Sequence, residues 1–303
     1  MSAPSAAIGQ AQVRAVSLKR SKIRVGDEIF KWALRFCLLV AFAFLAWLVG
    51  YMVYRGWARL DSRLWENMPT GRVSRVAEAG VQSAITGTIW IMAVTAAICL
   101  PVGIFGAIYL EEYADNNRWY NRLLELNVQN LAGIPSIIFG ILGLGLIVRQ
   151  FNLGFTVRAA GIVLALLVLP IVIIATREAI RAVPQSIRQA SYALGATKWQ
   201  TVSKQVLPAA IPGISTGTIL ALSRAIGEAA PLIMMGAVTF VLDNPDGLDS
   251  AYTALPIHIY GLLIKPQAEF QELAAAAIVL LLGIVLVMNS VAIFVRNRFQ
   301  KRW

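Results

Sequence analysis

The sequence predicts an all-α, polytopic membrane protein with six transmembrane helices. Of its residues 58% are hydrophobic and 14% are charged, whereas about a quarter of the residues of an ordinary soluble domain are charged. The mean hydropathy is +0.67, and the apolar residues gather in runs of about 20, the length that crosses a hydrocarbon core. Unsatisfied backbone groups are costly in lipid, so such runs form helices, and the short alternating segments of a membrane β-barrel are missing from the sequence.

Six apolar runs give the expected spans and the organisation of the chain. Residues 1–32 form a basic N-terminal tail, residues 33–54 a first anchor, residues 81–295 a core domain of five spans, and residues 296–303 a basic C-terminal tail. The anchor is expected to stay uncleaved because its apolar run is too long for a signal peptide. The expected spans are Ala33–Tyr54, Val81–Leu110, Val128–Val148, Val157–Ala175, Ile211–Leu242 and Leu273–Val295.

Basic residues predict the orientation, because Lys and Arg are retained on the cytoplasmic side of a membrane. An even number of spans places both termini on one side. Both termini are basic, through residues that include Lys19, Arg20, Lys22, Arg24, Lys31, Arg296, Arg298, Lys301 and Arg302. Arginines in the first outside loop argue mildly for the opposite orientation: Arg55, Arg59, Arg63, Arg72 and Arg75. The bias over the whole chain is about two to one for cytoplasmic termini.

The net charge of +11 favours membrane lipids over nucleic acid as the partner of the basic residues, because juxtamembrane Lys and Arg attract anionic headgroups. Cys37 and Cys99 both fall inside expected spans, which argues against a structural disulfide. His258 has no Cys or carboxylate at ligand spacing and is expected to be a loop residue. No metal site and no nucleic-acid interface are therefore expected.

A polar segment, Arg177–Pro208, separates the fourth and fifth spans; we call it the connecting segment. Pro184 suits the first turn of a helix, and Gly195 suits a left-handed C-terminal cap. Thr197 and Gln200 have the spacing of a capping box and open a second helix, which Pro208 is expected to end. Apolar residues recur at helical spacing on both helices: Ile187, Ala190, Ser191 and Leu194, then Trp199, Val202 and Val206. These signals fit either a device that docks on another protein or a solvated connector on the headgroups.

The run QASYALGATKWQTVSKQVLP of the connecting segment resembles the cytoplasmic loop of binding-protein-dependent ABC importer permeases. In that family a Glu-Ala-Ala triplet precedes a Gly and a later Leu-Pro, and the loop forms a coupling helix that docks in a groove of the ATPase subunit. In this chain Gln189 replaces the Glu and Ser191 the second Ala, so docking by shape is better supported than docking by charge. The resemblance assigns coupling to Gln189, Ala190, Ser191, Leu194, Gly195, Ala196, Leu207 and Pro208.

The sequence contains no G-x-x-x-x-G-K-[ST] phosphate loop. The chain is therefore expected not to be an enzyme and to bind no cofactor of its own. The resemblance implies that ATP and Mg are used by a partner ATPase subunit.

Two opposite charges, Arg224 and Glu228, share the fifth apolar run. Residues four apart lie on one face of a helix and can pair, and ionisable groups inside a membrane are costly. They are candidates for a substrate pathway, with Ser223 beside them and Arg177 as a second basic position; a structural ion pair and a snorkelling Arg177 are the alternatives. An Arg fork donates to two oxygens at once, which suits a tetrahedral oxyanion.

Glycines and prolines of two spans are candidates for helix flexibility or close packing. They are Gly133, Pro135, Gly140, Gly227 and Pro231. The outside loop Asp243–Phe270 includes TALPIHIYGLLI, which is too short to span and is expected at the interface.

Several motifs in order narrow the resemblance. AIYLEEYA at 107–114, GIPSIIFGILGLG at 133–145, the connecting segment and SRAIGEAAPL at 223–232 are similar to the A-type permease subunit of phosphate-specific importers. The resemblance implies a type I ABC importer permease fold in the bacterial plasma (inner) membrane. It also implies a C-type permease partner, two cytoplasmic ATPase subunits and an extracytoplasmic phosphate-binding protein.

Three other functions remain compatible with the sequence. A permease for molybdate, sulfate or phosphonate would share nearly every physical feature. An ion-coupled secondary transporter would need inverted repeats and broken helices around an ion site. A membrane sensor or scaffold would use the connecting segment only as a docking surface.

Overall fold

The computed structural model describes residues 25–115, 117–237 and 241–299, and no β-strand occurs among them. The chain divides into two compact units, Met1–Gly50 and Tyr51–Trp303. In the first unit helix α1 (Val25–Gly56) begins, and its large apolar side chains are exposed along the described residues. Residues 1–24 of the expected basic tail and residues 300–303 lie outside the described residues.

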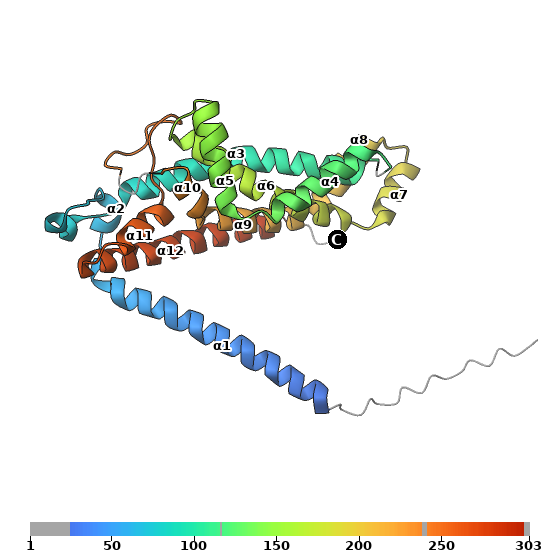
Figure 1. Cartoon of the computed structure of the whole chain (residues 1–303). Coiled ribbons are helices and arrows are strands. Elements are labelled where there is room, and N and C mark those ends of the chain that lie inside the picture. Colours follow the sequence, from blue (N-terminus) through green and yellow to red (C-terminus); the bar gives the residue numbers. More distant parts are fainter. Residues whose placement is uncertain (1–24, 116, 238–240, 300–303) are drawn as a thin grey trace, which may run out of the picture. The chain divides into compact units, whose positions relative to one another are not determined.

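The second unit is built from helices of very different length (Figure 1). In chain order they are η1 (Trp57–Arg59), α2 (Arg63–Glu66), η2 (Val73–Glu78), α3 (Gln82–Ile108), η3 (Tyr109–Tyr113), α4 (Trp119–Ala132), α5 (Ser136–Leu142), η4 (Gly143–Gln150), α6 (Val157–Arg181), α7 (Gln185–Ala193), α8 (Lys198–Thr201), η5 (Val202–Val206), α9 (Leu207–Ile226), α10 (Ala230–Met234), α11 (Leu255–Leu263) and α12 (Ala268–Phe299). Figure 1 shows α7 and α8 at one end of this unit and α2 at the other.

Within the described part of the chain, five uninterrupted helical stretches are long and apolar enough to cross a membrane, which confirms the all-α, multi-pass prediction. They are Gly26–Arg59, Gln82–Tyr113, Val157–Arg181, Lys198–Ile226 and Ala268–Arg298. A sixth span exists only if the bent pair of stretches Trp119–Ala132 and Ser136–Gln150 counts as one.

The third predicted span, Val128–Val148, is not one continuous helix. α4 and α5 meet at an angle of 107°, with Gly133 capping α4 and Pro135 preceding α5. Pro lacks a backbone N–H, and its ring disfavours the helical conformation at the preceding residue. The third expected span is therefore bent at Gly133–Pro135, two of the positions predicted for helix flexibility or packing.

The fifth predicted span, Ile211–Leu242, was wrong at both ends. One helix runs from Lys198 to Ile226, so the second helix of the connecting segment passes Pro208 without a break. Directly before Pro208 the backbone widens into the π-turn η5, where the Leu207 N–H donates to the Val202 carbonyl five residues earlier. A π-turn relieves the crowding that a proline ring causes in an α-helix. The stretch Lys198–Ile226 is called the long helix below.

The central helix of the second unit is α6, on which α3 and α9 pack. Small residues permit the close approach: a Cβ on Gly217 would lie 2.3 Å from the Ala175 Cβ, and one on Gly161 would lie 2.4 Å from a Val94 methyl. Thus the GxxxG pair of Gly213 and Gly217 faces α6, since Gly213 likewise meets Ala179. α9 is in this way held against a buried, rigid partner.

The helix α11 occupies the TALPIHIYGLLI segment and packs on α12. It has nine residues, in agreement with the prediction that this segment is too short to span. His258 lies fully buried within it, so its expected place in a loop was wrong.

Candidate functional site

The turn after α7 has the conformation that the sequence predicts. Gly195 adopts the left-handed conformation with φ +80°. Its N–H donates to the Tyr192 carbonyl at 2.9 Å, and the Ala196 N–H donates to the Ser191 carbonyl at 3.2 Å. These two bonds form a Schellman motif and satisfy the last carbonyls of the helix.

The helix that follows starts with a complete capping box. The Gln200 N–H donates to the Thr197 hydroxyl at 3.3 Å, and the Thr197 N–H donates to the Gln200 side chain at 2.8 Å. The hydroxyls of Ser191 and Thr201 lie 2.8 Å apart and join α7 to α8. The connecting segment is therefore a fixed helix-turn-helix, as predicted, although its second helix continues into the membrane.

The face of α7 that was expected to be apolar is largely open. Gln189, Ala190 and Leu194 are exposed, and Leu194 has 90% of its surface exposed. A hollow of about 400 Å³ adjoins them, lined by Ile187, Ala190, Ser191, Leu194, Ala196, Gln205 and Ala209. Leu194 and the hollow thus form an exposed, partly apolar surface beside the turn.

An ion-pair network lies beneath this surface and was not foreseen from the sequence. Arg177, with 13% of its side chain exposed, donates to Glu111 at 3.3 Å and to Glu125 at 2.9 Å. Arg181 donates to both carboxylate oxygens of Glu111, each at 3.0 Å. Arg177, the expected second basic position of the substrate pathway, thus pairs with two carboxylates, one from η3 and one from α4.

The buried member of the network is Arg188 of α7. Its guanidinium donates to Glu112 at 2.7 Å, and the two side chains have 9% and 8% exposure. No role was assigned to Arg188 from the sequence. The available signal was the Glu-Glu pair in AIYLEEYA, whose two carboxylates have no basic residue three or four positions away in the sequence.

Arg224 and Glu228 do not pair. α9 ends at Ile226, Gly227 caps it, and Glu228 stands in the short break before α10. Arg224 is exposed, whereas Glu228 is half-buried beside Thr88. The expected contact required an unbroken helix through both residues, and Gly227 interrupts it.

Ser223 connects two spans. Its hydroxyl lies 2.7 Å from the Ile219 carbonyl and 2.5 Å from Oδ1 of Asn289 on α12. Nearby, Arg296 of α12 donates to the Thr216 hydroxyl at 2.9 Å. Polar side chains therefore hold α12 to α9 on the same stretch that carries Arg224.

Gly140 and Pro231, predicted separately as flexible or packing positions, touch each other. A Cβ on Gly140 would lie 2.5 Å from the Pro231 carbonyl oxygen, so only glycine permits the contact of α5 with α10. Gly133 and Pro135 form the bend before α5, and Gly227 forms the break after α9. These residues shape and pack the two broken segments.

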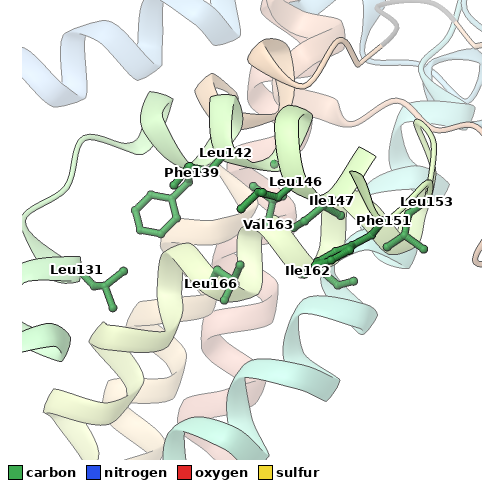
Figure 2. A pocket seen from close by; sticks show the side chains of 11 residues that line it. Leu131, Phe139, Leu142, Leu146, Ile147, Phe151, Leu153, Ile162, Val163 and Leu166 are labelled. Atoms are coloured by element: carbon green, nitrogen blue, oxygen red, sulfur yellow. The ribbon is translucent and has the colours of Figure 1, made fainter. Parts of the chain in front are cut away.

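An apolar cavity of about 340 Å³ lies along the same bent pair (Figure 2). Figure 2 shows Phe139, Leu142 and Leu146 turned towards α6, where Val163 and Leu166 complete the wall. Every lining side chain is apolar. The cavity offers no side-chain donor to an anion, and it is not a candidate substrate site.

Comparisons with known proteins identify the family. Residues 99–302 match the family model of the binding-protein-dependent transport system inner membrane component. The chain is 34% identical to the phosphate transport system permease protein PstA 1 of Mycobacterium tuberculosis over 85% of this chain and 84% of that one. It is 32% identical to PstA of Yersinia pestis over 84% of each chain.

A solved structure shares the fold at low sequence identity. A chain of a bacterial alginate ABC transporter superposes with a TM-score of 0.62 and 16% identity, over 92% of this chain and 99% of that chain. The fold is that of a type I ABC importer permease. This multi-pass membrane protein belongs to the family of binding-protein-dependent transport system inner membrane components.

Proposed function

We propose that the chain is the A-type permease subunit of an ATP-driven importer of inorganic phosphate. The observation that carries the proposal is its likeness, at 32–34% identity over most of the chain, to permeases named for phosphate transport. The partners are a C-type permease subunit, two cytoplasmic ATPase subunits and an extracytoplasmic phosphate-binding protein. ATP and Mg belong to the ATPases, because the sequence has no phosphate loop.

In this proposal the end that carries α7 faces the cytoplasm, together with both termini. The basic residues of the termini and the connecting segment support this orientation. Two arginines near the opposite end have structural partners that account for their presence there. Arg59 donates to the Ala77 carbonyl at 2.8 Å, and Arg158 pairs with Asp249 at 2.6 Å.

Coupling to the ATPases would use the exposed tip of α7. Leu194 offers an apolar anchor next to the hollow, and Gln189 is exposed at the position of the family's glutamate. Closure of the ATPases around ATP would displace this tip. The long helix has 29 residues and a length of about 40 Å, so the displacement would reach Arg224 within one secondary-structure element.

Arg224 would neutralise phosphate as it passes. Its guanidinium is exposed and is not paired with Glu228, so its donors are available to an oxyanion. A single Arg favours release as well as entry, since a pathway must bind its substrate weakly enough to let it go. Ser223 would act indirectly, by fixing α9 to α12 through Asn289.

Transport by the reconstituted complex tests the proposal. The chain, its candidate C-type partner, the ATPase and the binding protein are placed in vesicles, and radiolabelled phosphate uptake is measured with and without ATP. We expect ATP-dependent uptake that arsenate competes and sulfate or molybdate does not. ATP-driven uptake of another oxyanion would support the assignment as an ABC importer subunit and reject phosphate as its substrate. Uptake driven by an ion gradient without ATP would overturn the proposal.

A further inference from the structure

We infer that Arg188 is a positioning residue that fixes the coupling surface on α7 to the membrane helices, with Glu112 as its counter-ion. The inference rests on the proposed function and deepens it. It concerns a contact of α7 with the end of α6, which directly precedes it in the chain, and with the π-turn η3, which only tertiary structure brings near.

The guanidinium of Arg188 makes four hydrogen bonds in two directions. Nε and NH2 donate to Glu112 Oε1 at 3.1 and 2.7 Å. NH1 donates to the Val183 carbonyl at 2.7 Å, and NH2 also donates to the Ile180 carbonyl at 3.0 Å. The Ile180 carbonyl lies in the last turn of α6 and the Val183 carbonyl just after it. At a helix C-terminus backbone acceptors lack partners within the helix and a cation is favoured.

The surroundings of this contact are apolar and buried. Ile108, Ile180 and Val183 are buried in one apolar cluster that also contains Val202 and Val206 of η5. A charge in such a place is tolerated only while its partner and its hydrogen bonds are present. Arg188 and Glu112 therefore hold each other in place more strictly than an exposed pair does.

A neighbouring pair shows the difference. Arg181 and Glu178 lie 3.2 Å apart on the same face of α6, with 54% and 65% of their side chains exposed. Exposed pairs of this kind contribute little. Glu178 thus provides a matched control for Glu112: the same residue type at the same end of the unit, without burial.

Helix α7 is joined to the membrane helices at both of its ends and at its middle. The two ends are covalent connections: residues 182–184 lead from α6 into α7, and the turn at Gly195 leads from α7 into the long helix. The middle is held by Arg188, which bonds to the segment at the end of α6 and, through η3, to the end of α3. With Arg188 in place α7 moves as one body with these helices; without it α7 can pivot on its two covalent turns and lose the displacement that the ATPase imposes.

The test measures phosphate imported per ATP hydrolysed by the complete reconstituted transporter. The variants are Arg188→Lys, which keeps the charge and removes the fork, Glu112→Gln, and the control Glu178→Gln. We expect the ratio to fall roughly two- to thirtyfold in Arg188→Lys and Glu112→Gln while ATP hydrolysis continues, and to stay unchanged in Glu178→Gln. A merely structural role would lower uptake and hydrolysis together and leave their ratio constant, which would overturn the inference.

A milder variant keeps the test decisive if Arg188→Lys and Glu112→Gln assemble poorly. Glu112→Asp keeps the carboxylate and shortens it by one methylene, so we expect an assembled complex with an intermediate ratio; a wild-type ratio in that variant would overturn the inference. Failure of the proposed function has a different outcome. A wild-type complex that moves another oxyanion rejects phosphate as the substrate, and the ratio is then measured for that anion in the same variants.

Discussion

The two charged regions of the second unit are built in opposite ways. Around the connecting segment Arg177, Arg181 and Arg188 are all paired with carboxylates, and the most buried of them bonds to backbone carbonyls as well. Around the break after α9, Arg224 is exposed and its expected partner Glu228 faces elsewhere. The paired arginines are held in one geometry by their carboxylates, whereas the exposed guanidinium of Arg224 can donate hydrogen bonds to an anion that binds there. The difference distinguishes the region proposed to couple to the ATPases from the region proposed to bind the substrate.

The strongest test of this comparison is Arg224→Gln. Loss of a charge-assisted contact with phosphate should lower uptake about 10- to 150-fold, with the complex still assembled. Radiolabelled uptake and co-purification of the subunits measure the two effects. Arg224→Lys is the control, since it keeps the charge and should retain part of the uptake. Full uptake by Arg224→Gln would remove this residue from the pathway.

Leu194→Asp tests whether the exposed tip of α7 is an anchor for the ATPase. Truncation or polar replacement of an interface anchor typically costs 2 kcal/mol or more, so we expect about thirtyfold weaker ATPase binding by the purified membrane subunits. The stability of the permease should not change, because Leu194 is exposed. Gln185→Ala, at the other end of α7, should bind normally; equal binding by both variants would contradict the assignment.

Gly140→Ala tests the contact between α5 and α10. The added methyl would meet the Pro231 carbonyl, and overpacking of this kind costs about 1–3 kcal/mol. We expect a lower Tm of the purified complex. Gly145→Ala is the matched control, since no atom lies within 4 Å of its Cβ position. Equal melting of the two variants would mean that the contact contributes nothing.

Gln189→Glu should have the smallest effect. The position is exposed, so the unfolding free energy should change by no more than about 0.5 kcal/mol. If the ATPase groove presents a cation, the new carboxylate should strengthen binding at low salt and lose that gain at high salt. ATPase binding by Gln189→Glu and by the wild type is measured at several salt concentrations. Equal binding by the two at every concentration would mean that docking depends on shape and not on this charge.

Local signals in the sequence predicted much of the molecule. Apolar length gave the helical spans, and the left-handed Gly195 and the capping box of Thr197 and Gln200 lie where their spacing placed them. Each of these features depends on residues within a few positions of one another. Prolines had different outcomes: Pro135 lies at the bend of its span, as its flexibility prediction allows, whereas Pro208 was wrongly expected to end a helix that a π-turn lets continue.

The charge contacts required tertiary structure. Arg188 and Glu112 are 76 positions apart in the sequence, and no periodicity relates them. The Arg224–Glu228 prediction failed for a local reason, since Gly227 ends the helix between them. The coupling role of Leu194 was predicted from the resemblance and stays a prediction; the structure adds that its side chain is exposed.

The buried pair also limits how this protein can change over generations. A mutation that removes only Arg188 or only Glu112 leaves the other charge buried, at a cost of about 3–5 kcal/mol, and descendants carrying one half of the change would be selected against. Two apolar residues of similar volume could replace the pair without that loss. The two positions should therefore vary together among descendants, although 76 residues separate them.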